Sequence, residues 1–178
     1  MKKSLFASIL MVLIGGFFAS SVVADDKHHH NTLVRFQGGI GVIPVSSGVG
    51  TAATAEVVNR NIVRGVQPAG QIWVIRKLEA KVKTNGDIKV EGKGLILGGG
   101  DNAGRATGQS VFATLFCGTT TITEHSTTAV GVPLAADGDF EIDDVLMPIP
   151  TGGCASPMLL IRNAANLGWF AVGILDLD

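Results

Sequence analysis

The chain has 178 residues, of which 46% are hydrophobic and 16% charged, with 24 glycines, two cysteines and a formal net charge of -1. The length fits one domain, and the composition excludes a disordered chain and a coiled coil, which need high charge or abundant helix formers. The near-neutral charge, with no basic cluster, excludes a nucleic-acid-binding protein.

The N-terminal residues are typical of an export signal. Lys2 and Lys3 precede an apolar run that ends in small residues up to Ala24, where we expect a signal peptidase to cut. The alternative is an uncleaved membrane anchor. Cleavage leaves a flexible N-terminus over 25–32 and a single domain over 33–178, in the periplasm or outside the cell, with no second segment able to enter a membrane.

After residue 32 the sequence pattern predicts strands rather than helices. Apolar residues mostly recur at every second position, and turn residues interrupt them at intervals of about ten residues. This pattern predicts an all-β fold, an antiparallel β-sandwich of the jelly-roll or immunoglobulin type with about 8–10 short strands. Besides two hairpins, strands are expected over 33–43, 56–64, 71–75, 109–117, 120–124, 157–163 and 169–175.

The first hairpin surrounds an Asn-Gly pair. A three-residue loop, Thr84-Asn85-Gly86, places Val82 opposite Ile88 on one apolar face and puts the glycine in the left-handed position. A rival loop one residue further along would pair opposite charges across the strands. We prefer the first loop because the rival needs an aspartate in the left-handed position.

The second hairpin has the same arrangement. A three-residue loop over 136–138 would pair Leu134 with Phe140 and Val132 with Ile142. Acidic residues alternate with the apolar residues of its second strand. The repeated pattern indicates a recurring structural device and does not establish a gene duplication.

Two other strands are notable for their expected positions. Residues 111–116 are apolar on both faces apart from Thr114, which predicts a central strand. The closing segment over 170–178 is expected to be an edge strand. Its terminal acids would either protect the edge from pairing or mark an edge where a partner strand docks.

Cys117 and Cys154 are the two cysteines of the chain. An even number in an exported protein predicts a structural disulfide. Neither cysteine belongs to a Cys-x-x-Cys pair, so we do not expect a thiol oxidoreductase.

Three segments have residue types that bind ligands elsewhere. Acids alternate from Asp137 to Asp144, as the oxygen ligands of a divalent cation would, although alternation also explains them as the wet face of a strand. The glycine-rich segment from Gly98 to Gly108 lacks the helix that a dinucleotide site needs, so we interpret it as a loop and the first candidate ligand loop. The histidines at 28–30 are expected to be solvated in the N-terminus rather than bound to a specific metal.

Catalytic residues are harder to find. His125 and Ser126 are adjacent on an expected strand, so their side chains face opposite ways and cannot act as a nucleophile and its base. Trp73 and Trp169 could stack on sugars but are expected to pack in the core or at its rim.

We therefore expect a non-enzymatic exported protein with a structural or interaction role at the cell exterior, without catalytic residues, cofactor or metal. Its partner would be a protein or a glycan, and self-association is a further option. The alternative is a ligand-binding protein for a glycan or a divalent cation, which would use the glycine-rich loop or the acidic hairpin. A hydrolase with carboxylates from distant strands is a third hypothesis.

Overall fold

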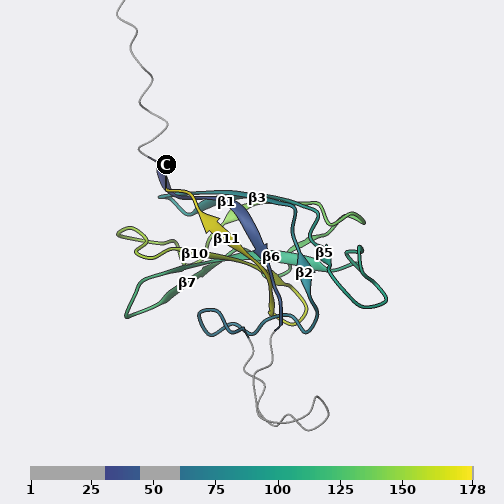
Figure 1. The fold of residues 1–178 in the computed structure, drawn as a ribbon. Coiled ribbons are helices and arrows are strands. Elements are labelled where there is room, and N and C mark those ends of the chain that lie inside the picture. The colour runs from purple at the N-terminus through teal and green to yellow at the C-terminus, as the bar shows by residue number, and fades with distance from the viewer. Residues whose placement is uncertain (1–30, 45–60, 178) are drawn as a thin grey trace, which may run out of the picture.

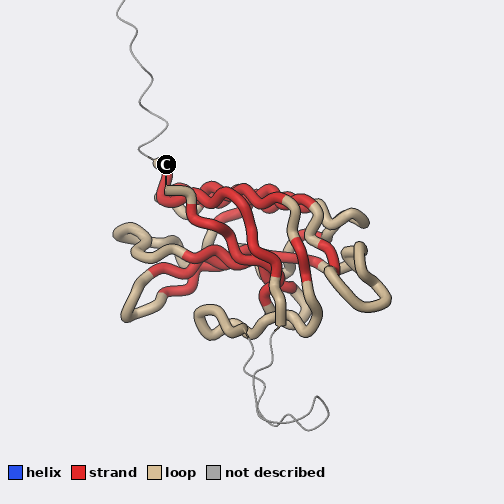
Figure 2. Tube along the Cα trace, viewed as in Figure 1, coloured by secondary structure: helices blue, strands red, loops and turns tan. Residues whose placement is uncertain are grey.

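The structure is a computed structural model that describes residues 31–44 and 61–177. This part of the chain contains eleven strands and no helix (Figures 1 and 2). The strands are β1 (Thr32–Gly41), β2 (Trp73–Val74), β3 (Lys77–Lys83), β4 (Asp87–Lys93), β5 (Ile96–Leu97), β6 (Ser110–Cys117), β7 (Thr123–Ser126), β8 (Val132–Pro133), β9 (Phe140–Val145), β10 (Met158–Asn163) and β11 (Trp169–Leu175). The strand predicted over 56–64 lies largely outside the described residues.

One antiparallel sheet contains nine of these strands. Its order is β7-β6-β10-β11-β1-β3-β4-β9, and β8 also pairs with β6. The sheet curls until its two end strands meet beside an isolated bridge, where Ser126 and Met147 exchange backbone hydrogen bonds of 3.0 and 2.8 Å. The all-β antiparallel prediction is confirmed, but the strands form one nearly closed, barrel-like sheet in place of the expected two-sheet sandwich.

The departure from a sandwich has a simple cause in the strand pairing. Figure 1 shows β1 and β3 above β6, β7 and β10, much as two layers would lie. The first and last strands of the sheet in chain order, β1 and β11, pair with each other, so the layers are continuous. The extra pair β2–β5 lies apart from this sheet.

The hairpin of β3 and β4 has the register predicted from its turn. Val82 pairs with Ile88, Ala80 pairs with Val90, and Gly86 has a φ of 89°. Every second residue of β3 is buried and the others are exposed or half-buried, as alternation requires. The outward residues of β3 and β4 are therefore charged, while their inward residues belong to the core.

The second hairpin is only partly as predicted. The turn over 136–138 is present, with a hydrogen bond of 2.9 Å from the Ala135 amide to the Asp139 carbonyl. Its arms then separate, so the predicted pairing of Val132 with Ile142 is wrong. Val132 pairs with Val111 of β6, and Ile142 pairs with Val90 of β4, because each arm meets a longer strand.

The strands β6, β10 and β11 form the apolar half of the sheet. The burial prediction for β6 is confirmed, since Val111 to Cys117 are all buried and strands flank β6 on both sides. The segment before β2 pairs with β11 at Trp169, whose amide donates to the Gln67 carbonyl at 3.0 Å. The prediction of an edge strand at the C-terminus is wrong, because β11 lies between β10 and β1.

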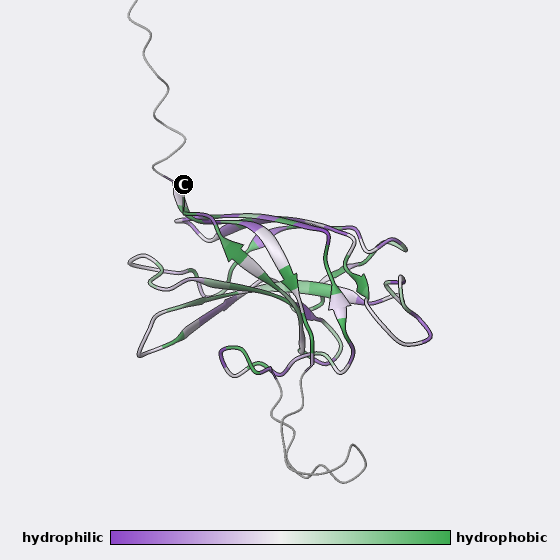
Figure 3. Ribbon diagram, viewed as in Figure 1, coloured by the Kyte–Doolittle hydropathy of each residue, from purple (hydrophilic) through white to green (hydrophobic). Residues whose placement is uncertain are grey.

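The core fills the space inside the curled sheet, and Figure 3 shows the hydrophobic colouring concentrated along β6 and β11. Trp73 and Trp169 are buried as expected, and Trp73 stacks on Phe170 with ring centroids 4.0 Å apart. Cys117 and Cys154 form the predicted disulfide, which indicates a non-reducing environment. Within residues 31–44 and 61–177, no helix could cross a membrane.

Candidate functional site

The outward residues of β1, β3, β4 and β9 form a surface that we call the charged face. Antiparallel register places residues of neighbouring strands side by side in rows across the sheet. The first row contains Arg35, Lys81, Lys89 and Asp143. The row next to it contains Gln37, Glu79, Glu91 and Glu141. A basic row therefore lies beside an acidic row.

Ion pairs connect many of these charges. Lys89 bonds Glu141 of the adjacent row at 2.8 Å, and Lys83 bonds Asp87 across the hairpin at 3.0 Å. The hydrogen bond with Lys89 lowers the pKa of Glu141, and the same bond raises the pKa of Lys89. Both shifts move the groups further from neutral pH, so these side chains remain charged under physiological conditions.

Hydrogen bonds also lower the pKa values of two acids near the second hairpin. Asp139 accepts a hydrogen bond from the Gly94 amide at 2.9 Å and lies 3.3 Å from the Lys93 ammonium. These contacts, the backbone bond first, lower the pKa of Asp139. Asp144 accepts from the Thr128 amide at 2.8 Å, which lowers its pKa as well. Asp139 and Asp144 of this hairpin are therefore engaged by this chain's own donors.

An open cleft of about 640 Å³ lies on the charged face. Its lining includes Arg35, Glu79, Lys81, Lys89, Glu91 and Asp143. Arg35 and Lys81 are directly opposite each other on β1 and β3, and both are half-buried. Among the described residues, neither side chain makes an ion pair or hydrogen bond, in contrast to Lys89. We call these two residues the cation pair.

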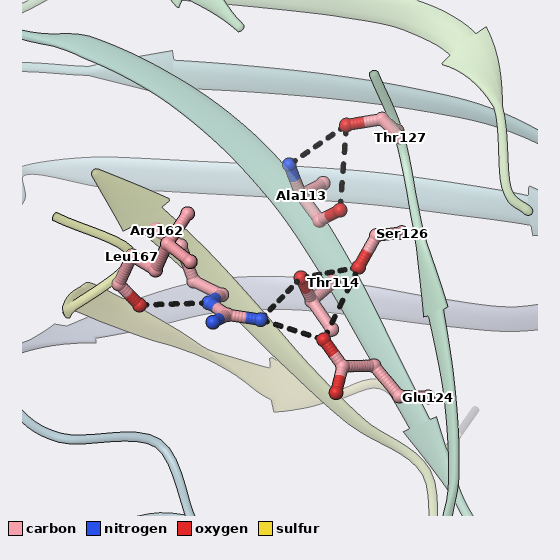
Figure 4. A network of polar contacts seen from close by, with 7 residues as sticks. All are labelled: Ala113, Thr114, Glu124, Ser126, Thr127, Arg162 and Leu167. Carbon is pink, nitrogen blue, oxygen red and sulfur yellow. Dashed lines mark hydrogen bonds and ion pairs between the residues drawn. The ribbon is translucent and has the colours of Figure 1, made fainter. Parts of the chain in front are cut away.

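A second polar cluster lies on the outward side of the apolar half, where Thr114 and Arg162 are buried (Figure 4). Arg162 of β10 donates to Glu124 at 2.7 Å and to the Leu167 carbonyl at 2.9 Å. Its guanidinium also lies over the Phe112 ring, 5.1 Å from the centroid. Thr114 and its neighbours complete the network in Figure 4. Because the chain itself supplies these partners, the cluster fixes the positions of β6, β7 and β10.

His125 is buried, with Nδ1 2.6 Å from the Pro148 carbonyl oxygen and Nε2 2.9 Å from the Thr123 hydroxyl. A carbonyl can only accept, so Nδ1 carries a proton. Ser126 lies on the other face of β7, against Thr114, as the sequence predicted. The structure therefore does not bring His125 and Ser126 together.

The remaining predicted sites have separate locations. The loop from Gly98 to Gly108 folds back on β5, where the Gly104 amide donates to the Leu97 carbonyl at 2.8 Å, and it does not line the cleft. No group of three or more His, Cys, Asp or Glu in residues 31–44 and 61–177 could hold a metal ion. The histidines at 28–30 and the export signal over 1–24 lie outside the described residues.

Comparison with known proteins finds no matching family model, no matching curated protein and no matching solved structure. The functional argument therefore depends on the geometry of this chain alone. Sequence reasoning missed the cation pair, because Arg35 is 46 positions from Lys81 and only strand pairing joins them. Alternation placed Lys81 on the wet face of its strand, and this was the one local signal available.

Proposed function

We propose that this protein is an exported, non-enzymatic binding protein that holds its ligand on the charged face. The observation that carries the proposal is the cation pair, which lies half-buried in an open cleft and has no partner among the residues that the structure describes. Like charges directly opposite each other on neighbouring strands destabilise a sheet. A bound ligand that supplies a negative charge would explain why Arg35 and Lys81 lie opposite each other beside a cleft.

The ionisation of the charged face favours binding over acid–base catalysis. A general acid or base works best with a pKa near the operating pH. The shifts at Asp139, Glu141, Lys89 and Lys93 all run the other way, with the acids lowered and the lysines raised. Such groups are permanent charges, which suits recognition of a charged or hydrogen-bonding ligand.

Export is supported by two features. Lys2 and Lys3, the apolar run and the small residues before Ala24 have the order of a signal peptide. The Cys117–Cys154 disulfide fits an oxidising compartment such as the periplasm or the cell exterior. Expression in a secreting bacterium should yield a mature chain that begins at Asp25. Recovery of the chain with Met1 intact in the cytoplasm would contradict export.

A ligand screen tests the binding function. Neutral, acidic and amino sugars, together with acidic and basic peptides, would be added to the oxidised protein while its melting temperature is measured. A ligand at 100 times its Kd stabilises a native protein by about 2.7 kcal/mol, a shift of several degrees. We expect at least one class of probe to raise the melting temperature.

A matched pair of double variants then locates the effect. Glu79→Gln with Lys81→Gln alters the cleft without changing the net charge. Asp101→Asn with Arg105→Gln does the same on an exposed loop outside the cleft. The ligand should stabilise only the loop variant. Equal stabilisation of both variants, or no stabilisation by any probe, would contradict the proposed function.

A further inference from the structure

We propose that the cation pair binds the carboxylate of a sugar acid, either free or as one residue of an acidic oligosaccharide. This inference rests on the proposed function and names the ligand class of the same cleft. It depends on three properties of the charged face. Arg35 and Lys81 have no ion-pair partner among the described residues, and nearby acids form ion pairs with other lysines. The adjacent row of residues offers oxygen atoms that can accept hydrogen bonds.

The first property is the unmet charge. Arg35 and Lys81 occupy paired positions of β1 and β3, so their side chains leave the sheet side by side. A guanidinium offers a planar fork of donors that matches the two oxygens of a carboxylate, and an ammonium adds a third donor and a point charge. Together they form a suitable site for one oxyanion.

The second property is that three of the nearby acids have other partners, and that a fourth, Asp143, lies opposite Lys89 rather than beside the cation pair. Lys77 lies 3.2 Å from Glu79, Lys83 lies 3.0 Å from Asp87, and Lys89 lies 2.8 Å from Glu141. Lys81 has no acid opposite it on β4, because the hairpin register places it opposite Lys89. These three acids therefore do not supply the negative charge for the cation pair.

The third property is the chemistry one row away. Residues two positions apart on a strand are about 7 Å apart, so a group held by the cation pair also reaches Gln37, Glu79 and Glu91. Each glutamate uses only its Oε1 in an ion pair, with Lys77 and Lys93 respectively. The second oxygen of each carboxylate remains able to accept a hydrogen bond from a hydroxyl group.

These acids also restrict the ligand. A densely charged polyanion would place negative groups against Glu79 and Glu91 and, at the end of the basic row, against Asp143. Such like-charge contacts suppress the wrong partners. A sugar acid avoids them because it has a single carboxylate next to uncharged hydroxyl groups. Charge complementarity therefore favours a sugar acid over a nucleic acid, a polyphosphate or a strongly acidic peptide.

The test uses the oxidised mature protein, labelled for nuclear magnetic resonance and titrated with sodium D-glucuronate, D-glucose, D-glucosamine and inorganic phosphate. Two variants, Arg35→Gln and Lys81→Gln, remove one cation each. Two controls, Arg105→Gln and Arg76→Gln, each remove one exposed cation that does not line the cleft. Cellobiouronate, a disaccharide of one glucuronate and one glucose, is titrated separately to distinguish a free acid from an oligosaccharide.

We expect glucuronate to shift amide signals of β1 and β3 in a saturable way. Each cleft variant should bind at least about tenfold more weakly, because a charge-assisted hydrogen bond is lost, while both controls bind as the unaltered protein does. Tighter binding of cellobiouronate identifies an oligosaccharide as the ligand, and equal binding identifies the free acid. Both results support the carboxylate site.

Several results would overturn the inference. Glucose or glucosamine could bind the charged face with no dependence on Arg35, which would leave the proposed function intact but change the ligand class. Phosphate could bind as tightly as glucuronate, which would make the pair a general anion site. A dimer whose formation depends on Lys81 would identify a second copy of the chain as the occupant. Absence of any glucuronate shift on β1 and β3 would also refute it, while the broader screen still tests the proposed function.

Discussion

The strands of the charged face, which we call the charged half of the sheet, and the strands of the apolar half differ in how they bury their side chains. In β3 and β4 each strand buries one face and exposes the other, so the sequence alternates. In β6 and β10 both faces are buried, and the sequence is an almost continuous apolar run. The comparison teaches that outward residues contribute to stability in one half and are available for binding in the other.

The largest expected effect comes from the outward side of the apolar half. Leu160 shares a face with Thr114 and Arg162 and is nevertheless fully buried. Leu160→Ala should lower the free energy of unfolding by about 2–5 kcal/mol, because it leaves a cavity. Lys77→Ala, outward on β3, should change it by less than about 0.5 kcal/mol. Urea unfolding measures both, and similar losses would remove the distinction between the halves.

Removal of the disulfide is the next test. Replacing Cys117 and Cys154 with serine opens a loop of 37 residues, which costs up to about 4 kcal/mol in the chain-entropy model. The loss should appear in the free energy of unfolding, with ligand binding on the charged face preserved. The reduced unaltered protein is the control for the two added hydroxyls. Loss of binding along with stability would show that the two halves are not independent.

A third test addresses the inward face of the charged half. Gly92 of β4 lies directly under the Phe140 ring, which occupies the space that a side chain would need. Gly92→Ala should therefore destabilise the protein by about 1–3 kcal/mol through overpacking. Gly70→Ala is the matched control, because nothing surrounds that position. Equal melting temperatures for the two variants would mean that the ring moves aside freely.

The polar cluster of the apolar half should give a smaller effect. Glu124→Gln weakens the contact with the Arg162 guanidinium, whose side chain is only 10% exposed. Because Glu124 itself is half exposed, we expect a loss of about 1 kcal/mol, measured by urea unfolding. The variant Glu124→Asp keeps the charge but shortens the side chain, so it tests whether the length of the side chain matters. A loss as large as that of Leu160→Ala would make this cluster, rather than apolar packing, the main source of stability in this half.

The smallest effect is the pH dependence of the charged half. Hydrogen bonds lower the pKa values of Asp87, Asp139 and Glu141 in the folded protein. Their contribution is therefore complete above the unfolded-state values of 3.8 and 4.5 and is lost as the pH falls through the lower folded values. Melting temperature should decline below about pH 4. A Lys89→Gln variant should decline less steeply, and an identical decline would show that the pair with Glu141 contributes nothing.

Local features of the fold were predictable and long-range ones were not. The turn at Gly86, the register of Val82 with Ile88 and the disulfide follow from alternation, glycine conformation and cysteine number. The pairing of β1 with β11 joins opposite ends of the chain, and no local pattern specifies it. For this reason the sequence predicted a sandwich and a C-terminal edge.

The candidate site follows the same division. Alternation predicts that Lys81 points outward, but Arg35 becomes its neighbour only through the pairing of β1 with β3. A cation site stayed an alternative for the acidic hairpin because its bases, Lys89 and Lys93, belong to another part of the sequence. A ligand site built across strands is therefore hidden from any single stretch of sequence.

The bridge between Ser126 and Met147 gives the barrel a preferred place to open. Two backbone hydrogen bonds join the ends of β7 and β9 there, whereas β4 and β9 are paired along six positions. Local fluctuations follow the segments with the fewest contacts. We therefore expect the sheet to open first along this line, close to the buried imidazole of His125. Opening there separates β7 from β9, whereas β1 and β3, which carry the cation pair, stay paired along five positions.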